Sequence, residues 1–236
     1  WQLLEPEIER YRWVGKRTSA AMCQTAETIE PGMTEHEIAA VLGGALLSHG
    51  ILPAVLLIAT DERCYRYRHP VPTEKKLKRQ AMLAIGARRW GLGVSATRMV
   101  YFGQPDEELR RRHEAVCRVD ACLIRETVVG AAVKDIFARA IETYAATGYG
   151  EEWKKHHQGG ATGYAPRDYR GGLRSSEVVL EGQAFAWNPS ISGTKSEDTI
   201  IATAAGQEIL SASDDWPLVE ISYGDSTLGR PDILVR

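Results

Sequence analysis

The chain has 236 residues, enough for one large domain or two small ones, and its 44% hydrophobic content can fill a sizeable core. The formal net charge of −2 gives no reason to expect nucleic acid or an acidic membrane surface as a partner. No apolar run approaches the roughly 18 residues that cross a bilayer. Four cysteines without a C-x-x-C spacing favour a reducing, cytoplasmic compartment.

The first half of the chain predicts two helices followed by strands. Thr34 and Glu37 have the spacing of a capping box, which is typical of a helix start. A polar, aromatic loop over 61–76 separates the first strand from a hairpin whose turn contains Gly91 and Gly93. The expected elements are helices over 4–29 and 34–49, a strand over 54–60 and the two-stranded hairpin over 82–103.

The second half repeats this order of helices and then strands. Its expected elements are helices over 105–128 and 132–146 and strands near 183–190, 197–203 and 207–210. The two halves, roughly 1–103 and 104–222, therefore resemble an internal duplication, although no residue-level repeat is visible. Helices outside a curved, mostly antiparallel sheet form an α+β architecture. Residues 223–236 are expected to be a C-terminal tail, either an arm against a partner subunit or a surface tail.

Several segments carry a resemblance to a known family. The hairpin contains A-I-G-A…G-V-S-A-T-R, YRHPVP carries His69, and HHQGGATG begins at His156. EGQAFAWNPSISG and GTKSEDTIIAT follow in order. This series resembles the pita-bread family of Xaa-Pro aminopeptidases, prolidases, methionine aminopeptidases and creatinases. The resemblance covers nearly the whole chain and implies a single pita-bread domain over 1–222. Arg98, in the T-R pair of the hairpin, is expected to pair with an acidic residue inside this domain.

In that family five side chains hold two metal ions, and the resemblance places only one of them, Glu197, on a matching residue. The positions that differ are Ala84, Ser95, Gly160 and Asn188. Each dication needs several oxygen or imidazole ligands, so these residues cannot hold a two-metal site. The sequence therefore predicts no dinuclear metal centre and no cofactor. A single-ion site rebuilt from Glu197, His69 and His157 is the remaining metal alternative.

The resemblance also implies candidate functional residues, because the creatinase branch hydrolyses a C–N bond without metal, using a histidine as acid and base. On that analogy His69 is expected to transfer protons, with His156 or His157 as the second imidazole. Glu197 is expected to orient a histidine or to accept a cationic group. The expected ligand-binding residues are Arg167 and Lys195 for a carboxylate, Asn188 for an oxygen that develops charge, and Ser95, Tyr65, Tyr67 and Tyr164 as pocket lining.

Three functions remain open from the sequence. The first is metal-independent hydrolysis, or other C–N bond chemistry, on a small amino acid, amidine or peptide derivative. The second is a catalytically inactive pseudopeptidase that binds a small ligand or a protein partner in the same cleft. The third is a metal-dependent Xaa-Pro dipeptidase or aminopeptidase. A homodimer is expected, since family members of this type commonly dimerise. The chain starts at Trp1 without an initiator Met, which leaves room for upstream sequence.

Overall fold

The computed structural model describes the whole chain, residues 1–236, as five α-helices around mostly antiparallel strands. The helices are α1 (Glu5–Thr28), α2 (Glu35–Leu47), α3 (Glu62–Arg66), α4 (Glu107–Glu126) and α5 (Val133–Ala146). The strands are β1 (Leu52–Thr60), β2 (Gln80–Arg89), β3 (Leu92–Tyr101), β4 (Gly159–Thr162), β5 (Tyr169–Arg170), β6 (Gln183–Trp187), β7 (Ser190–Ile191), β8 (Thr194–Lys195), β9 (Asp198–Thr203), β10 (Gly206–Ile209), β11 (Leu218–Tyr223), β12 (Ser226–Pro231) and β13 (Leu234–Val235). All the expected helices and strands form, with ends within a few residues of their predicted positions.

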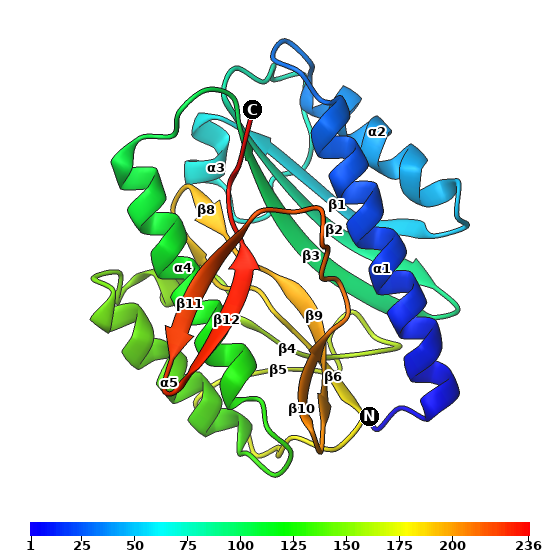
Figure 1. Ribbon diagram of the computed structural model, residues 1–236, viewed down its shortest axis with the longest axis vertical. Coiled ribbons are helices and arrows are strands. Elements are labelled where there is room, and N and C mark those ends of the chain that lie inside the picture. The colour runs from blue at the N-terminus through cyan, green and yellow to red at the C-terminus, as the bar shows by residue number, and fades with distance from the viewer.

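The first half packs α1 and α2 against a sheet with the order β1-β2-β3-β13. Figure 1 shows the two helices side by side over this sheet. The capping box that opens α2 is confirmed: the Glu37 amide donates to Thr34 Oγ1 at 3.1 Å, and the Thr34 amide donates to the Glu37 carboxylate at 2.7 Å. The apolar faces of both helices form the largest core of the molecule together with the inner face of β2 and β3.

The second half places α4 and α5 against a second sheet with the order β10-β9-β6-β4-β5. Aromatic side chains from the sheet, Phe185 and Trp187, fill the space beneath α4 and α5 and are almost fully buried. The two sheets meet at their centre, where the Thr97 amide of β3 donates to the Glu197 carbonyl just before β9 at 3.0 Å. This junction brings the hairpin of the first half against the strands of the second.

The C-terminal residues 223–236 are not a tail, contrary to the expectation from the sequence. They complete the β11–β12 hairpin and then form β13, which pairs in parallel with β3. The Arg230 side chain is only 1% exposed, because it is enclosed by α4 and β9 and holds the hairpin there. The polar loop expected over 61–76 also differs, since it contains the short helix α3.

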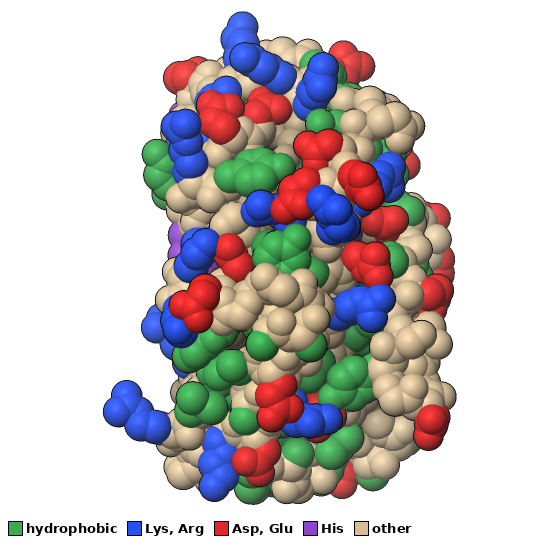
Figure 2. All heavy atoms as spheres, turned by 90° about the vertical axis from the view of Figure 1, so that its left-hand side faces the viewer, with side chains coloured by type: hydrophobic (Ala, Val, Ile, Leu, Met, Phe, Trp, Pro, Cys, Tyr) green, Lys and Arg blue, Asp and Glu red, His purple; other side chains and the backbone are tan.

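The outer surface carries charges of both signs. Figure 2 shows acidic and basic side chains interspersed with small hydrophobic patches over the face on which α4 and α5 lie. No helix of the chain combines the length and apolar character that crossing a membrane requires.

Candidate functional site

A cavity of about 260 Å³ lies between the central hairpin β2–β3 and the strands of the second half. This volume is at the small end of ligand pockets in proteins. Most of the residues predicted from the sequence line it: His69, Ser95, His157, Tyr164, Arg167, Asn188, Lys195 and Glu197. Ala84 also lines the cavity, from β2. The structure therefore brings together side chains from segments that are more than 100 residues apart in the chain.

Glu197, the only carboxylate in the cavity lining, is 4% exposed and is held by three neighbours. Lys195 Nζ lies 2.7 Å from its Oε2 atom, Thr97 Oγ1 donates to the same oxygen at 2.7 Å, and Arg167 lies 3.6 Å from Oε1. Burial by itself would raise the pKa of this carboxyl, but the charges of Lys195 and Arg167 outweigh it and lower the pKa. Glu197 is therefore an ion-paired carboxylate at neutral pH.

Three imidazoles cluster beside this ion pair. The ring centroids of His69 lie 5.6 Å from His156 and 5.8 Å from His157, and the rings of His156 and His157 stack at 5.3 Å. Burial first, and then the positive charge of Lys195 among others, lowers the pKa of His69 and brings the pKa of His156 to about 2. Burial and the charge of Arg167 lower the pKa of His157 to about 4. All three rings are neutral at pH 7.

The cluster answers which of the adjacent histidines faces the cavity. His157 lines it together with His69, whereas His156 packs behind them. His156 Nε2 is buried without a hydrogen-bond partner, and its Nδ1 atom lies 3.4 Å from Gln158 Nε2. Of the two adjacent histidines, His157 lies at the cavity, and His156 contacts the other two rings without lining it.

Asn188 contributes a polar group that the protein leaves unsatisfied. It is 3% exposed, lines the cavity, and has a side-chain Oδ1 atom with no hydrogen-bond partner. A buried polar atom without a partner costs free energy, so it is normally completed by water or a ligand. The Asn188 amide is thus available to a molecule in the cavity.

Two of the expected lining residues lie elsewhere. Tyr67 is 48% exposed and outside the cavity, with the Arg63 guanidinium 4.8 Å from its ring centroid. Tyr65 is likewise exposed and does not line the cavity. The predicted loop instead forms α3, and the Tyr67 ring packs on a side chain of that helix, which draws it away from the cavity.

Sequence reasoning missed two cations that line the cavity, Arg88 and Arg170. The two-residue alternation of a strand puts Arg88 on the same face of β2 as Ala84 and Gly86, so a strict reading of that period could have found it. Arg170 lies opposite Gly160 in the β4–β5 pairing. No local sequence pattern places Arg170 at the cavity, because its position depends on the pairing of β4 with β5.

Gly160 stands where the family resemblance places a histidine ligand, and the backbone there leaves no room for a side chain. Its φ is +151°, and a Cβ atom would collide with the Tyr169 carbonyl oxygen and lie 2.7 Å from the Gly171 amide nitrogen. No group of three or more His, Cys, Asp or Glu side chains is placed to hold a metal ion. With Glu197 already paired to Lys195, the residues present do not fit a dinuclear metal centre.

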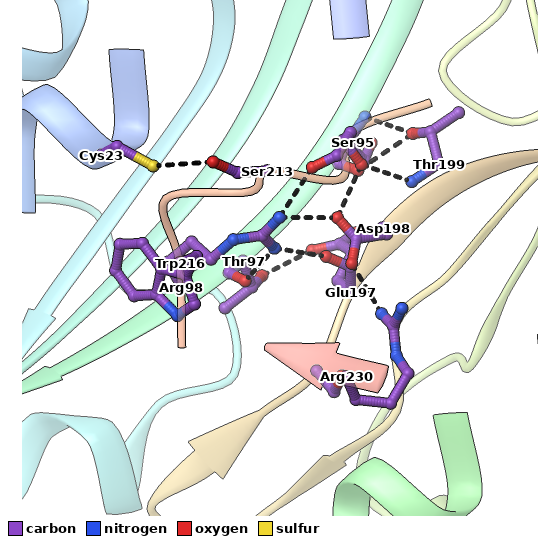
Figure 3. Close-up of polar contacts among 12 residues, drawn as sticks. Cys23, Ser95, Thr97, Arg98, Glu197, Asp198, Thr199, Ser213, Trp216 and Arg230 are labelled. Carbon is purple, nitrogen blue, oxygen red and sulfur yellow. Dashed lines mark hydrogen bonds and ion pairs between the residues drawn. The ribbon is translucent and has the colours of Figure 1, made fainter. Parts of the chain in front are cut away.

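A buried charge network lies directly behind Glu197 and fixes its strand. Arg98 donates to Asp198 at 2.9 Å, and Arg230 bridges Asp198 and Asp120 at 2.6 Å each. Figure 3 shows Arg98 and Arg230 approaching Asp198 from opposite sides, next to the contact between Thr97 and Glu197. The predicted acidic partner of Arg98 is therefore Asp198. The network ties β3, β9, β12 and α4 together at the base of the site.

Comparison with known proteins identifies the family. Residues 9–204 match the sequence profile of metallopeptidase family M24, so the chain belongs to that family. The Xaa-Pro dipeptidase of Pyrococcus horikoshii is 25% identical over 219 residues, covering 89% of this chain and 62% of that protein. An uncharacterized peptidase of Staphylococcus haemolyticus is 24% identical, with the same coverage of 89% and 62%. The chain thus spans less than two thirds of the length of these curated relatives.

Solved structures confirm the predicted pita-bread fold. The Xaa-Pro dipeptidase from Bacillus anthracis superposes with a TM-score of 0.85 at 22% identity, covering 99% of this chain and 63% of that one. The methionine aminopeptidase from Rickettsia prowazekii superposes with a TM-score of 0.72 at 17% identity, over 90% of this chain and 99% of that one. At this level of identity the likeness establishes the architecture alone.

Proposed function

We propose that this M24 family member works without a dinuclear metal centre and catalyses hydrolysis, or other C–N bond chemistry, on a small amino acid, amidine or peptide derivative. The observation that carries the proposal is the 2.7 Å contact between Lys195 Nζ and Glu197. The Lys195 ammonium group places a fixed positive charge beside Glu197, the one acidic residue that lines the cavity. A fixed cation of this kind can bind a carboxylate of the substrate.

The proton-transfer step is assigned to His69. Its ring is neutral at pH 7 and partly exposed at the cavity, so it can accept a proton from an attacking water molecule. The resulting hydroxide attacks the carbon of the C–N bond, and the imidazolium returns the proton to the departing nitrogen. The side-chain amide of Asn188 then donates to the oxygen on which the attack places negative charge, while Arg167 and Lys195 bind a carboxylate of the substrate.

A second candidate function, ligand binding without turnover, is favoured by a different observation. The carboxylate of Glu197 is occupied by Lys195, Arg167 and Thr97 and does not hydrogen-bond any of the three imidazoles. A catalytic base is usually oriented by a third group through its other ring nitrogen. A pseudopeptidase that uses the cavity for a ligand or a partner would not need that orientation.

The test combines a chelator with a matched pair of variants. The full chain is screened against dipeptides, amidino compounds and N-acylated amino acids, with product separated by chromatography. We expect turnover that EDTA does not change, that falls about 100-fold or more in His69→Ala, and that is unchanged in His36→Ala on the surface of α2. Turnover that EDTA abolishes would favour a metal-dependent Xaa-Pro dipeptidase, and binding without turnover would favour the pseudopeptidase.

The homodimer and the reducing, cytoplasmic compartment stay proposals. The first rests on the family resemblance and is tested by sedimentation of the full chain. The second is supported by the cysteines, since Cys23, Cys64, Cys117 and Cys122 are all free and buried.

A further inference from the structure

The charges that line the cavity do not balance. Four cationic side chains face it, together with a single carboxylate, Glu197. The cationic residues are Arg88, Arg167, Arg170 and Lys195. The histidines add no negative charge, and no other acidic residue lines the cavity. Positive charge in a low-dielectric cleft raises the local concentration of anions and strengthens their binding.

Two of the four cations contact Glu197 and two do not. Lys195 and Arg167 lie inside, where both contact Glu197. Arg88 and Arg170 are exposed on the outer side of the cavity and form no ion pair within the chain. Arg88 donates only to backbone carbonyls, those of Gly91 at 3.1 Å and Tyr164 at 3.3 Å. Arg88 and Arg170 therefore keep their full charge for a ligand.

The neutral part of the cavity points to an amide. Asn188 presents a buried side-chain amide without a partner, which can pair with the amide of a ligand through complementary hydrogen bonds. The apolar lining from Ala54, Val55 and Leu57 of β1 leaves room for a short aliphatic spacer between polar ends. A cavity of about 260 Å³ limits the ligand to a small molecule.

We propose that the ligand of this site is a small amide with two acid groups, that is, an N-acylated or peptide-linked glutamate or aspartate. One carboxylate binds at Arg167 and Lys195, the amide pairs with Asn188, and the second carboxylate binds at Arg170, while Arg88 adds to the positive potential of the cavity. This proposal rests on the proposed function, because it names the substrate class of the same cavity.

Titration calorimetry on the full chain tests the inference with two probes of equal size. N-acetyl-L-glutamate carries two carboxylates, and N-acetyl-L-glutamine replaces the second one with an amide. We expect the glutamate probe to bind about tenfold more tightly at low salt, and the difference to shrink as salt is added. Equal affinity for the two probes, or no binding of either at millimolar concentration, would overturn the inference.

Variants locate the preference. Arg170→Gln should reduce the difference between the two probes severalfold, and Arg88→Gln should reduce it in the same direction. Arg174→Gln is the matched control, because Arg174 is exposed in the neighbouring loop and does not line this cavity. A preference that survives in both Arg170→Gln and Arg88→Gln would contradict the assignment.

The two proposals fail in different ways. A charge preference without any product leaves the ligand class standing and removes the catalytic proposal. Turnover of neutral derivatives without a charge preference leaves the catalytic proposal standing and removes the ligand class. Calorimetry reads binding and chromatography reads turnover, so one set of samples separates these results.

Discussion

Lys195 and Glu197 lie two residues apart and meet at 2.7 Å inside the cavity, because alternate residues of an extended chain point to the same side. Arg167 approaches the other oxygen of the same carboxylate at 3.6 Å. Side-chain cations thus surround the one acidic position that the family resemblance retains. The contact explains why the carboxylate can stay buried and charged.

The first prediction concerns this ion pair. Lys195→Met should lower the free energy of unfolding by about 3 kcal/mol, because it leaves a buried carboxylate with a more distant partner. The double variant Lys195→Met/Glu197→Gln should recover most of that loss. Urea denaturation measures both. A double variant that is less stable than Lys195→Met would show that the unpaired Glu197 carboxylate is not what destabilises Lys195→Met.

The second prediction concerns acid stability. His156 and His157 have pKa values of about 2 and about 4 in the folded chain, below the unfolded value of about 6.5. Between pH 6.5 and 4 the unfolded state therefore binds more protons, so stability falls as the pH falls. Each imidazole that stays neutral in the folded chain steepens the dependence of the unfolding free energy on pH by about 1.4 kcal/mol per pH unit, and by less where water reaches the ring.

Replacing the buried ring tests this dependence. His156→Asn should flatten the slope of unfolding free energy against pH between 6.5 and 4, whereas His49→Asn, on the surface after α2, should leave it unchanged. Denaturation midpoints at a series of pH values give the slope. An unaltered slope in His156→Asn would contradict the neutral assignment of that imidazole.

The third prediction concerns the network behind the site. Arg230→Met should cost about 3–5 kcal/mol, since it removes the cation shared by two buried carboxylates, Asp120 and Asp198. Arg118→Met breaks an exposed i,i+4 pair with Glu114 on α4 and should cost less than about 0.5 kcal/mol. Thermal denaturation compares the two. Similar melting temperatures would mean that the buried network adds little.

The fourth prediction concerns Gly160. A single methyl group in Gly160→Ala should destabilise the chain by about 3 kcal/mol or more, from backbone strain and from collision with the β5 backbone. Gly172→Ala, where an added Cβ meets nothing within 4 Å, is the control and should be nearly neutral. If Gly160→Ala is equally tolerated, the backbone does not exclude a ligand side chain at this position.

The helices and strands of the protein could be predicted because the sequence patterns that specify them are local. The Thr34–Glu37 capping box, the helical apolar stripes and the glycine-rich turn of the hairpin each act within a few residues. The shared cavity of Ala84, Ser95 and Glu197 followed from the family resemblance. That inference does not require the β2–β3 register, since residues along both strands of the hairpin line the cavity.

What the sequence did not predict depends on pairing between distant segments. Residues 223–236 look like a tail because their turn residues hide two strands, β12 and β13, that pair with β11 and β3. Arg170 enters the cavity through its position opposite Gly160, and Tyr67 leaves it because α3 forms. Periodicity within a segment carries no information on which strand will be its neighbour.

The most direct test of the central claim is the metal content of the full chain after incubation with Mn²⁺, Co²⁺ or Zn²⁺ and gel filtration, measured by mass spectrometry. The expected result is that wild type retains no ion that Glu197→Gln loses. Two retained ions per chain, both lost in Glu197→Gln, would contradict it.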